Sequence, residues 1–362
     1  MPTFAIACGG TGGHLFPGLA VARACLRRGH NVLLFVSRKP VDREILAANP
    51  DLPAVALSTT GWTGLHPRVP TFLLNFWRGL QESRSALRQH HVAAVLGMGG
   101  FTCAPPLLEA RRLGLPAFLH ESNAIPGKVT RWFGPRLDKV LLGLPACAEH
   151  LPNCRTVVTG TPVRDSLIRL EPGVARSHFS LDPNRFTIAV MGGSQGAAGL
   201  NEMMLRAAAD LADIGPQLQV IHLTGPTDKG LMHANYQRAG IKAEVLPFCH
   251  EMEKVYSAAD LVVARSGASS GAELAHYGLP SILVPYPEAA EDHQTRNAEV
   301  FVRAGAARLV PQKRDEGAPL ARAIRDLFEN AAERRAMGEA ARRIAPTDAT
   351  ARIVQELEHA VA

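Results

Sequence analysis

This sequence contains no long hydrophobic run. Its 362 residues are 46% hydrophobic and 20% charged, a composition typical of globular domains. No apolar stretch approaches the roughly 20 residues that a membrane-spanning helix needs. The first residues lack the basic segment of a signal peptide and lead directly into a strand-like run and glycines. We therefore expect no signal peptide and no spanning segment, and the length favours two domains.

Cysteines and aromatic residues are also few. The six cysteines are scattered without a Cys-x-x-Cys pair, which favours buried thiols in a reducing cytosol over disulfides or a zinc site. The formal net charge is +6, while only 6% of the residues are aromatic. Because the basic residues come without interleaved aromatics or a nucleic-acid motif, we expect phosphorylated ligands or anionic lipid as partners, and not nucleic acid.

Two nucleotide-binding signatures are missing. No Gly-Lys-Ser/Thr follows a glycine turn, which argues against a P-loop. The dinucleotide fingerprint needs a third glycine where Leu15 stands, and the second strand-like run ends at Ser37 and Arg38 instead of an acidic residue. An arginine there would suit NADP, so the missing glycine carries this argument. No Asp-x-Asp pair offers a metal bridge to a diphosphate, and we expect no cofactor or metal.

The sequence does contain three glycine-rich turns, each after an apolar strand-like run. They are GGTGGH at 9–14, GMGGF at 97–101 and GGSQGA at 192–197. Glycine allows positive φ and a close approach of the backbone to a ligand. A strand, a glycine turn and a helix N-terminus together form an anion site from backbone N–H groups and the helix dipole. The first and third units are nearly equivalent, which indicates a duplicated domain.

Strand-like and helix-like runs alternate along the chain, a pattern typical of parallel α/β sheets. The strands are expected near 3–8, 31–36, 92–96, 116–120, 139–142, 155–158, 186–191, 218–223, 242–246, 261–264, 281–284 and 307–310. We predict two Rossmann-like domains, residues 1–161 and 162–345, with a C-terminal helix at about 346–362 crossing back to the first. Ligands bind at the carboxyl ends of such strands, so facing domains would gather all three turns around one cleft.

With these turns in place, the chain resembles the MurG family of bacterial N-acetylglucosaminyltransferases over nearly its whole length. The motifs that carry the resemblance are GGTGGHLFPGLAVA at 9–22, GMGGF at 97–101, HESN at 120–123, GTPVR at 160–164, GGSQGA at 192–197, RSGASSGAE at 265–273 and DHQTRNA at 292–298. The resemblance implies a GT-B fold, two Rossmann-like domains with parallel sheets facing across a cleft. It implies an acceptor lipid bound mainly by the first domain and UDP-N-acetylglucosamine (UDP-GlcNAc) bound mainly by the second.

The implied reaction moves GlcNAc, with inversion, to the 4-hydroxyl of undecaprenyl-diphospho-muramoylpentapeptide (lipid I), giving lipid II for peptidoglycan. The implied location is peripheral, on the cytoplasmic face of the inner membrane, with cell-wall synthesis and division proteins as further partners. A UDP-sugar transferase acting on another lipid acceptor and a non-catalytic nucleotide-sugar binding module are the alternatives. The second is disfavoured because GGTGGH would then have no use.

The resemblance also assigns donor-binding positions. In the first domain, Thr11, Gly12 and Gly13 face the donor and Asn123 lies near its sugar. Near the phosphates the resemblance places Arg164 and Ser194, and at uracil a backbone contact from Cys249. The nucleotide turn and helix comprise Ala268, Ser269, Ser270 and Glu273, with Glu273 on the ribose, and the GlcNAc hydroxyls are read by His293 and Gln294. Several residues depart from the commonest family pattern and put single contacts in doubt: Phe101, Ser122, Thr161, Gly271 and Ala272. The last two are expected to make the start of the nucleotide helix looser.

Two residues are candidates for the catalytic base. His14 follows a glycine turn at a helix start, where the positive dipole end disfavours imidazolium. A neutral imidazole there would serve as base, or it would only orient acceptor or backbone groups. Glu121 ends a strand at the active edge of the sheet; it is the alternative base, or it fixes His14, or it forms a structural ion pair. His120 points to the opposite face and is expected to be a core histidine.

A helical stripe at 72–80 has two interpretations. Leu73, Phe76, Trp77 and Leu80 share one helix face. Basic residues flank it at Arg68, Arg78, Arg84 and Arg88. The stripe is either an ordinary core face or a peripheral anchor, because aromatic and apolar side chains ringed by arginines suit an anionic bilayer surface.

Overall fold

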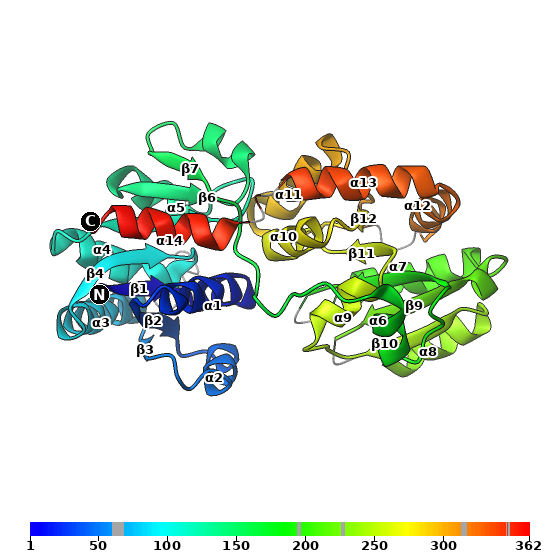
Figure 1. The fold of residues 1–362 in the computed structure, drawn as a ribbon, viewed down its shortest axis with the longest axis horizontal. Coiled ribbons are helices and arrows are strands. Elements are labelled where there is room, and N and C mark those ends of the chain that lie inside the picture. The colour runs from blue at the N-terminus through cyan, green and yellow to red at the C-terminus, as the bar shows by residue number, and fades with distance from the viewer. Residues whose placement is uncertain (60–68, 194–196, 226–228, 313–316, 345, 347) are drawn as a thin grey trace. The chain divides into compact units, whose positions relative to one another are not determined.

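The computed structural model describes residues 1–59, 69–193, 197–225, 229–312, 317–344, 346 and 348–362. The chain forms two compact units, one from Met1–Arg164 together with Pro346–Ala362, the other from Asp165–Ala345 (Figure 1). Each unit is a parallel sheet with helices packed on it.

The first unit is built on a seven-stranded sheet in the order β3-β2-β1-β4-β5-β6-β7, with every pair parallel. Its strands are β1 Thr3–Ala7, β2 Asn31–Ser37, β3 Ala54–Leu57, β4 Val92–Gly97, β5 Ala117–Glu121, β6 Lys139–Leu142 and β7 Thr156–Val158. The strand order reverses between β1 and β4, and the carboxyl ends of the strands at such a switch point form the usual ligand crevice.

The helices of the first unit run between these strands. They are α1 Gly12–Arg27, α2 Pro40–Ala47, α3 Val69–Gln89, α4 Ala104–Arg112, α5 Lys128–Phe133 and α14 Ala349–His359, with short 3₁₀ turns η1 Phe101–Cys103, η2 Gly134–Arg136 and η3 Pro145–His150. Helix α14 comes from the far end of the chain and lies beside α1. It buries Ile353, Val354 and Leu357 in the same core as β1 and α1. Lys139 of β6 also pairs with Glu356 at 2.5 Å.

The second unit has a six-stranded sheet in the order β10-β9-β8-β11-β12-β13, again parallel throughout. Its strands are β8 Phe186–Met191, β9 Leu218–Leu223, β10 Lys242–Leu246, β11 Leu261–Ala264, β12 Ser281–Leu283 and β13 Ala307–Leu309. Its helices are α6 Pro172–His178, α7 Ala198–Asp210, α8 Lys229–Arg238, α9 Met252–Ala258, α10 Ala268–Tyr277, α11 His293–Arg303, α12 Ala318–Glu329 and α13 Ala331–Ile344, with 3₁₀ turns η4 Gly215–Gln217 and η5 Ala290–Asp292. The strand order reverses between β8 and β11.

All strands expected from the sequence are present, within about a residue of the expected ends. The short strand β3 was missed. It lies at the sheet edge, and only Leu57 of its four residues is buried. All four residues are apolar, so the sequence shows no alternation that would mark a strand.

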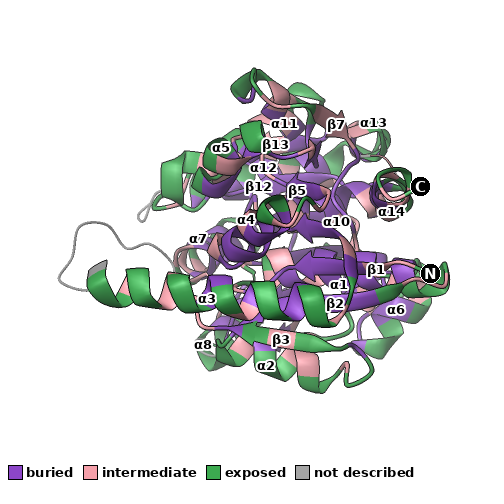
Figure 2. Cartoon of the chain, turned by 90° about the vertical axis from the view of Figure 1, so that its left-hand side faces the viewer, coloured by how far each residue is buried: buried purple, intermediate pink, exposed green. Residues whose placement is uncertain are grey.

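Helix α3 divides the apolar stripe between core and surface (Figure 2). Leu80 is buried, and Phe76 packs against the core with its ring 5.7 Å from that of Phe101. By contrast, Leu73 and Trp77 are each 57% exposed. Each of the two interpretations therefore fits part of the stripe, because Phe76 and Leu80 contact the core and Leu73 and Trp77 do not. Arg68 lies outside the described residues.

Candidate functional site

Three motifs meet at the switch point of the first sheet. The Gly9–Gly10 turn follows β1, the Gly99–Gly100 turn follows the neighbouring β4, and Glu121 is the last residue of β5, which pairs with β4. Parallel strands end at the same edge, so residues far apart in the sequence are gathered at one place.

The His14 ring packs directly against the backbone of the Gly99–Gly100 turn. Both glycines have positive φ, +95° and +71°. A Cβ atom on Gly99 would lie 3.1 Å from Nε2 of His14, and one on Gly100 would lie 3.1 Å from Nδ1. Both the backbone conformation and the close approach of the imidazole therefore require residues without side chains.

The surroundings of His14 keep its imidazole neutral. Its Nδ1 lies 3.0 Å from the Thr11 hydroxyl. Burial lowers the pKa of His14 below its ordinary value near 6.5; the Glu121 carboxylate opposes that shift, the Lys39 ammonium adds to it, and Asp42 opposes it more weakly. A neutral ring at pH 7 retains one nitrogen lone pair that can accept a proton.

Asp42 supports the first glycine turn, and sequence reasoning missed it. Its carboxylate is fully buried and its Oδ2 accepts hydrogen bonds from Gly10 N at 2.9 Å, Ser37 N at 2.8 Å and Ser37 Oγ at 2.6 Å. Lys39 adds a bond from Nζ to the Gly10 carbonyl at 2.9 Å. An acidic residue in the first turn of a helix is usually exposed to solvent and interacts favourably with the helix dipole. Nothing in the sequence therefore marked Asp42 as buried.

Glu121 organises the loop that follows β5. Its carboxylate is buried and accepts four hydrogen bonds, from Asn123 N at 3.0 Å and Asn123 Nδ2 at 2.9 Å on Oε1, and from Gly127 N at 2.8 Å and Thr130 Oγ1 at 2.7 Å on Oε2. A carboxylate engaged in this way fixes the position of Asn123. It has little capacity left to take a proton from a substrate.

His120 is a core histidine, as expected. It is fully buried, its Nε2 donates to the Gly160 carbonyl at 2.9 Å, and its Nδ1 lies 3.2 Å from the Ser122 hydroxyl. Ser122, one of the departures from the family pattern, is therefore a hydrogen-bond partner of His120. Thr161 is likewise buried. Phe101 packs within an aromatic cluster, with its ring 5.3 Å from that of Phe72 and tilted by 56°.

The second unit repeats this arrangement at its own switch point. Gly192 and Gly193 follow β8, with a φ of +96° at Gly193. The next expected phosphate contact, Ser194, lies outside the described residues. On the neighbouring strand, β11 leads through Gly267 into α10, whose half-buried first turn holds Ala268, Ser269 and Ser270.

Helix α10 is firmly packed, contrary to the expectation of a looser start. A Cβ atom on Gly271 would lie 2.9 Å from Cζ of Phe301, so the Phe301 ring fills the space beside the glycine. Glu273, two residues further on, accepts a 2.5 Å hydrogen bond from the Tyr256 hydroxyl to Oε2. This bond directs the carboxylate from the side of α9.

Arg265 is a buried cation that sequence reasoning did not single out. Its Nη1 donates to the carbonyls of Val284 and Pro285, both at 3.0 Å, and its Nη2 donates to Oε1 of Gln312 at 2.5 Å. These partners are neutral groups, and burial lowers the pKa of Arg265 to about 10. Because it bonds to the segments after β12 and β13 from the end of β11, Arg265 holds three strand ends together.

The remaining predicted donor contacts are spread over both units. Cys249 lies half-buried after β10, and burial raises the pKa of its thiol. His293 begins α11, with Nδ1 2.8 Å from the Ala290 carbonyl, and Gln294 accepts a bond from Tyr286 N at 2.9 Å. Arg164 ends the first unit, where its guanidinium lies 4.6 Å from the centre of the Phe16 ring on α1.

Within the described part of the chain, no three His, Cys, Asp or Glu side chains gather to hold a metal ion. Among the same residues, no helix is long and apolar enough to span a bilayer.

The contact between His14 and the Gly99–Gly100 turn can be tested by mutation. Gly100→Ala adds a methyl group 3.1 Å from the ring and should displace the imidazole, moving the pKa of His14 back toward 6.5. Gly114→Ala is the matched control, since Gly114 has a similar φ of +72° with nothing within 4 Å. Both variants should lose about 1–2 kcal/mol of stability from backbone strain, but only the first should shift the His14 titration measured by NMR. An unchanged His14 titration in Gly100→Ala would contradict the proposed effect of this contact on the pKa of His14.

Comparisons with known proteins agree with this geometry. The model of the glycosyltransferase family 28 N-terminal domain matches residues 4–142, and that of the C-terminal domain matches residues 187–355. Proteins named UDP-N-acetylglucosamine–N-acetylmuramyl-(pentapeptide) pyrophosphoryl-undecaprenol N-acetylglucosamine transferase are similar throughout. Those of Geobacter sulfurreducens and Halorhodospira halophila are each 38% identical, with 97% and 99% of both chains covered, respectively.

Solved structures show the same architecture. The crystal structure of Acinetobacter baumannii MurG superposes with a TM-score of 0.80 at 27% identity, covering 99% of this chain and 100% of that one. The UDP co-structure of S. aureus MnaA gives a TM-score of 0.70 at 13% identity, with 99% and 96% covered, which supports the fold alone. The predicted GT-B fold class is confirmed, and the chain belongs to glycosyltransferase family 28 and, within it, to the MurG family of N-acetylglucosamine transferases.

Proposed function

We propose that this protein transfers GlcNAc from UDP-GlcNAc to the 4-hydroxyl of undecaprenyl-diphospho-muramoylpentapeptide, forming lipid II with inversion at the anomeric carbon. Membership of the MurG family carries the proposal, since relatives that match end to end bear the name of this activity. Transfer of radiolabelled GlcNAc to a polyprenyl-diphospho-muramoyl acceptor tests it. Transfer only to a different lipid acceptor would support the alternative glycolipid transferase.

In this proposal the second unit binds the donor at its switch point. The glycines after β8, Ser194 next to them in the sequence, and the first turn of α10 receive the diphosphate and the nucleotide, with backbone N–H groups at the helix start as donors. Glu273 accepts the ribose hydroxyls, Cys249 supplies a backbone contact to uracil, and His293 and Gln294 read the sugar. Arg164 balances the charge of the departing UDP. Thr11, Gly12, Gly13 and Asn123 complete the contacts from the first unit.

His14 is the proposed general base. If Nδ1–H donates to the Thr11 hydroxyl, 3.0 Å away, the lone pair on Nε2 is free to take the proton of the acceptor hydroxyl. The oxygen then attacks the anomeric carbon, the bond to the UDP oxygen breaks, and its electron pair leaves with UDP. Glu121 acts in this proposal as a positioning residue, because its four hydrogen bonds all hold the loop that carries Asn123.

Removing the base should slow the chemical step. His14→Ala should lower kcat by about 10²–10⁴-fold at a nearly constant donor KM, the usual share of a general base. In the parent protein, kcat/KM should fall on acidification through a pKa below 6.5, since burial lowers the pKa of His14 and only the neutral ring accepts a proton. The reverse result, a large loss in Glu121→Gln with little effect at His14, would transfer the role to Glu121.

The donor assignment is tested at Glu273. Glu273→Ala should weaken UDP binding by about 1–3 kcal/mol, the scale of a lost hydrogen bond to a charged group, as measured by calorimetry. Glu299→Ala is the control, because that α11 carboxylate is already paired with Arg296 and Arg303. UDP affinity equal to that of the parent in Glu273→Ala would remove Glu273 as the ribose ligand.

The proposed acceptor carries a membrane lipid, so we also propose that the protein docks on the cytoplasmic face of the inner membrane. The exposed part of α3 supports this proposal: Leu73, Leu74 and Trp77 are 57%, 47% and 57% exposed, and the helix carries the exposed Arg78, Arg84 and Arg88 (Figure 2). Apolar burial would supply most of the binding, and each arginine near anionic lipid would add about 1 kcal/mol. Contacts with cell-wall synthesis and division proteins belong to the same proposal.

Replacing Leu73 and Trp77 together by serine should reduce sedimentation with cardiolipin-containing vesicles. Because these side chains lie outside the core, the thermal midpoint should stay close to that of the parent. The KM for the lipid acceptor should rise, whereas the KM for a short-chain soluble analogue should not. Gln81→Ser, an exposed change on the same helix, serves as the control. Vesicle binding equal to that of the parent would place the anchor elsewhere.

A further inference from the structure

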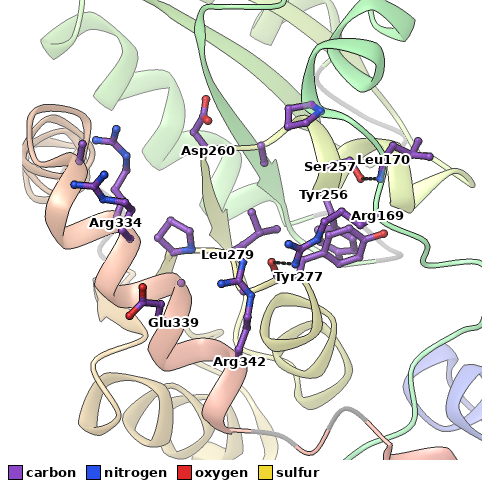
Figure 3. A pocket seen from close by; sticks show the side chains of 17 residues that line it. Arg169, Leu170, Tyr256, Ser257, Asp260, Tyr277, Leu279, Arg334, Glu339 and Arg342 are labelled. Atoms are coloured by element: carbon purple, nitrogen blue, oxygen red, sulfur yellow. Dashed lines mark hydrogen bonds between the residues drawn. The ribbon is translucent and has the colours of Figure 1, made fainter.

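A basic pocket lies in the second unit, away from the switch point. It has a volume of about 530 Å³, within the size range of small-molecule sites. Its walls come from the segment before α6, from α9, from the end of α10 and from α13 (Figure 3). Asp260 lines it just before β11, and Leu279 and Pro280 line it just before β12. The pocket therefore sits at the amino ends of these strands, opposite the edge where the donor site is proposed.

The charge of this pocket is unbalanced. Four arginines and two carboxylates line it, Arg169, Arg334, Arg335, Arg342, Asp260 and Glu339. Asp260 is already neutralised from outside the pocket by Arg176, whose Nη2 lies 2.7 Å from Oδ2. Glu339 is then the only carboxylate of the lining that can offset the four guanidinium groups.

Two of these arginines donate hydrogen bonds to backbone carbonyls. Arg334 donates to the Phe328 carbonyl at 2.7 Å, and Arg169 donates to the Tyr277 carbonyl at 2.6 Å. Among the described residues, Arg335 and Arg342 have no hydrogen-bond or ion-pair partner, and both are exposed. The Arg342 side chain lies against the backbone of Gly278. The C-terminal dipole of α10 accounts for a cation near Tyr277, where Arg342 lies. It does not account for Arg335, which is two turns of α13 away from Arg342.

The spacing on α13 directs both side chains to the pocket. Arg335, Gly338 and Arg342 occupy positions i, i+3 and i+7, which share one helix face. Gly338 gives the close approach between them: a Cβ atom there would lie 2.6 Å from the Gly278 carbonyl oxygen. The backbone of Gly278 fills that space, and the two arginines stand on either side of this contact, with their backbones about 10 Å apart along the axis.

We propose that this pocket is a second anion site, which binds a ligand carrying a diphosphate or two phosphate groups between Arg335 and Arg342. Two flexible guanidinium groups that line one pocket can engage an extended, multiply charged anion at two points, which a single phosphate does not offer, and arginine forks match phosphate oxygens. The site is independent of the proposed donor site and of the transfer reaction.

Inorganic diphosphate is the probe, titrated calorimetrically into the full chain at fixed ionic strength. Arg335→Gln with Arg342→Gln should weaken the binding at least tenfold. Arg343→Gln, which removes an exposed charge from the same turn of α13 without touching the pocket, should leave the affinity unchanged. Diphosphate bound at the proposed donor site would contribute equally to all three proteins, so the comparison does not depend on whether UDP-GlcNAc is the substrate.

A gain of binding provides the second arm. Glu339→Gln removes the opposing carboxylate and should tighten diphosphate binding severalfold, a change that unfolding cannot imitate. Equal affinity of the parent and the double variant would overturn the proposal, and so would no heat of binding in the parent. In either case the arginines would serve only the C-terminal end of α10 and the solvent face of α13.

Discussion

The approach of the His14 ring to the bare backbone of Gly99 and Gly100 is the contact on which the first unit's site depends. It requires two glycines with positive φ, a strand that ends directly before them, and a helix start that aims His14 across the neighbouring strand. Each requirement belongs to a different segment, and the strand order β1-β4 brings them together. The imidazole is consequently held by sterics, which keep its orientation without occupying both of its nitrogens.

Buried carboxylates then stabilise the backbone around that contact. Asp42 holds the first turn and Glu121 holds the loop after β5, each through bonds to backbone N–H groups. A buried carboxylate is costly unless its oxygens accept several hydrogen bonds, and here those donors are the turns themselves. Removing either carboxylate would leave buried N–H groups unsatisfied, so turn geometry and charge stabilise one another. This coupling accounts for two buried acidic residues beside the turns of a unit in which His14 is the proposed base.

Most of the architecture could be predicted because its signals are local. A glycine turn after an apolar run is visible in about ten residues, and the repeat of that unit at 186–197 indicated the second sheet. Burial is not local. Asp42 and Arg265 read as ordinary surface charges, yet tertiary packing encloses both. The interpretation of the stripe on α3 stayed open for the same reason: periodicity identifies a face, whereas tertiary packing decides that Leu80 is covered and Trp77 is not.

Helix α10 connects the switch point of the second unit to the opposite edge of its sheet. Its first turn follows β11 at the switch point, while its last residue is tied to Arg169 and its C-terminal Gly278 is covered by α13 at Gly338. Tyr256, from α9, reaches the middle of the helix at Glu273. Helix α10 is restrained at its C-terminal end, on its side by Phe301, and at Glu273 by Tyr256. It cannot rotate about its axis without breaking several of these contacts at once. The orientation of Glu273 is therefore a property of the whole unit and not of its own turn.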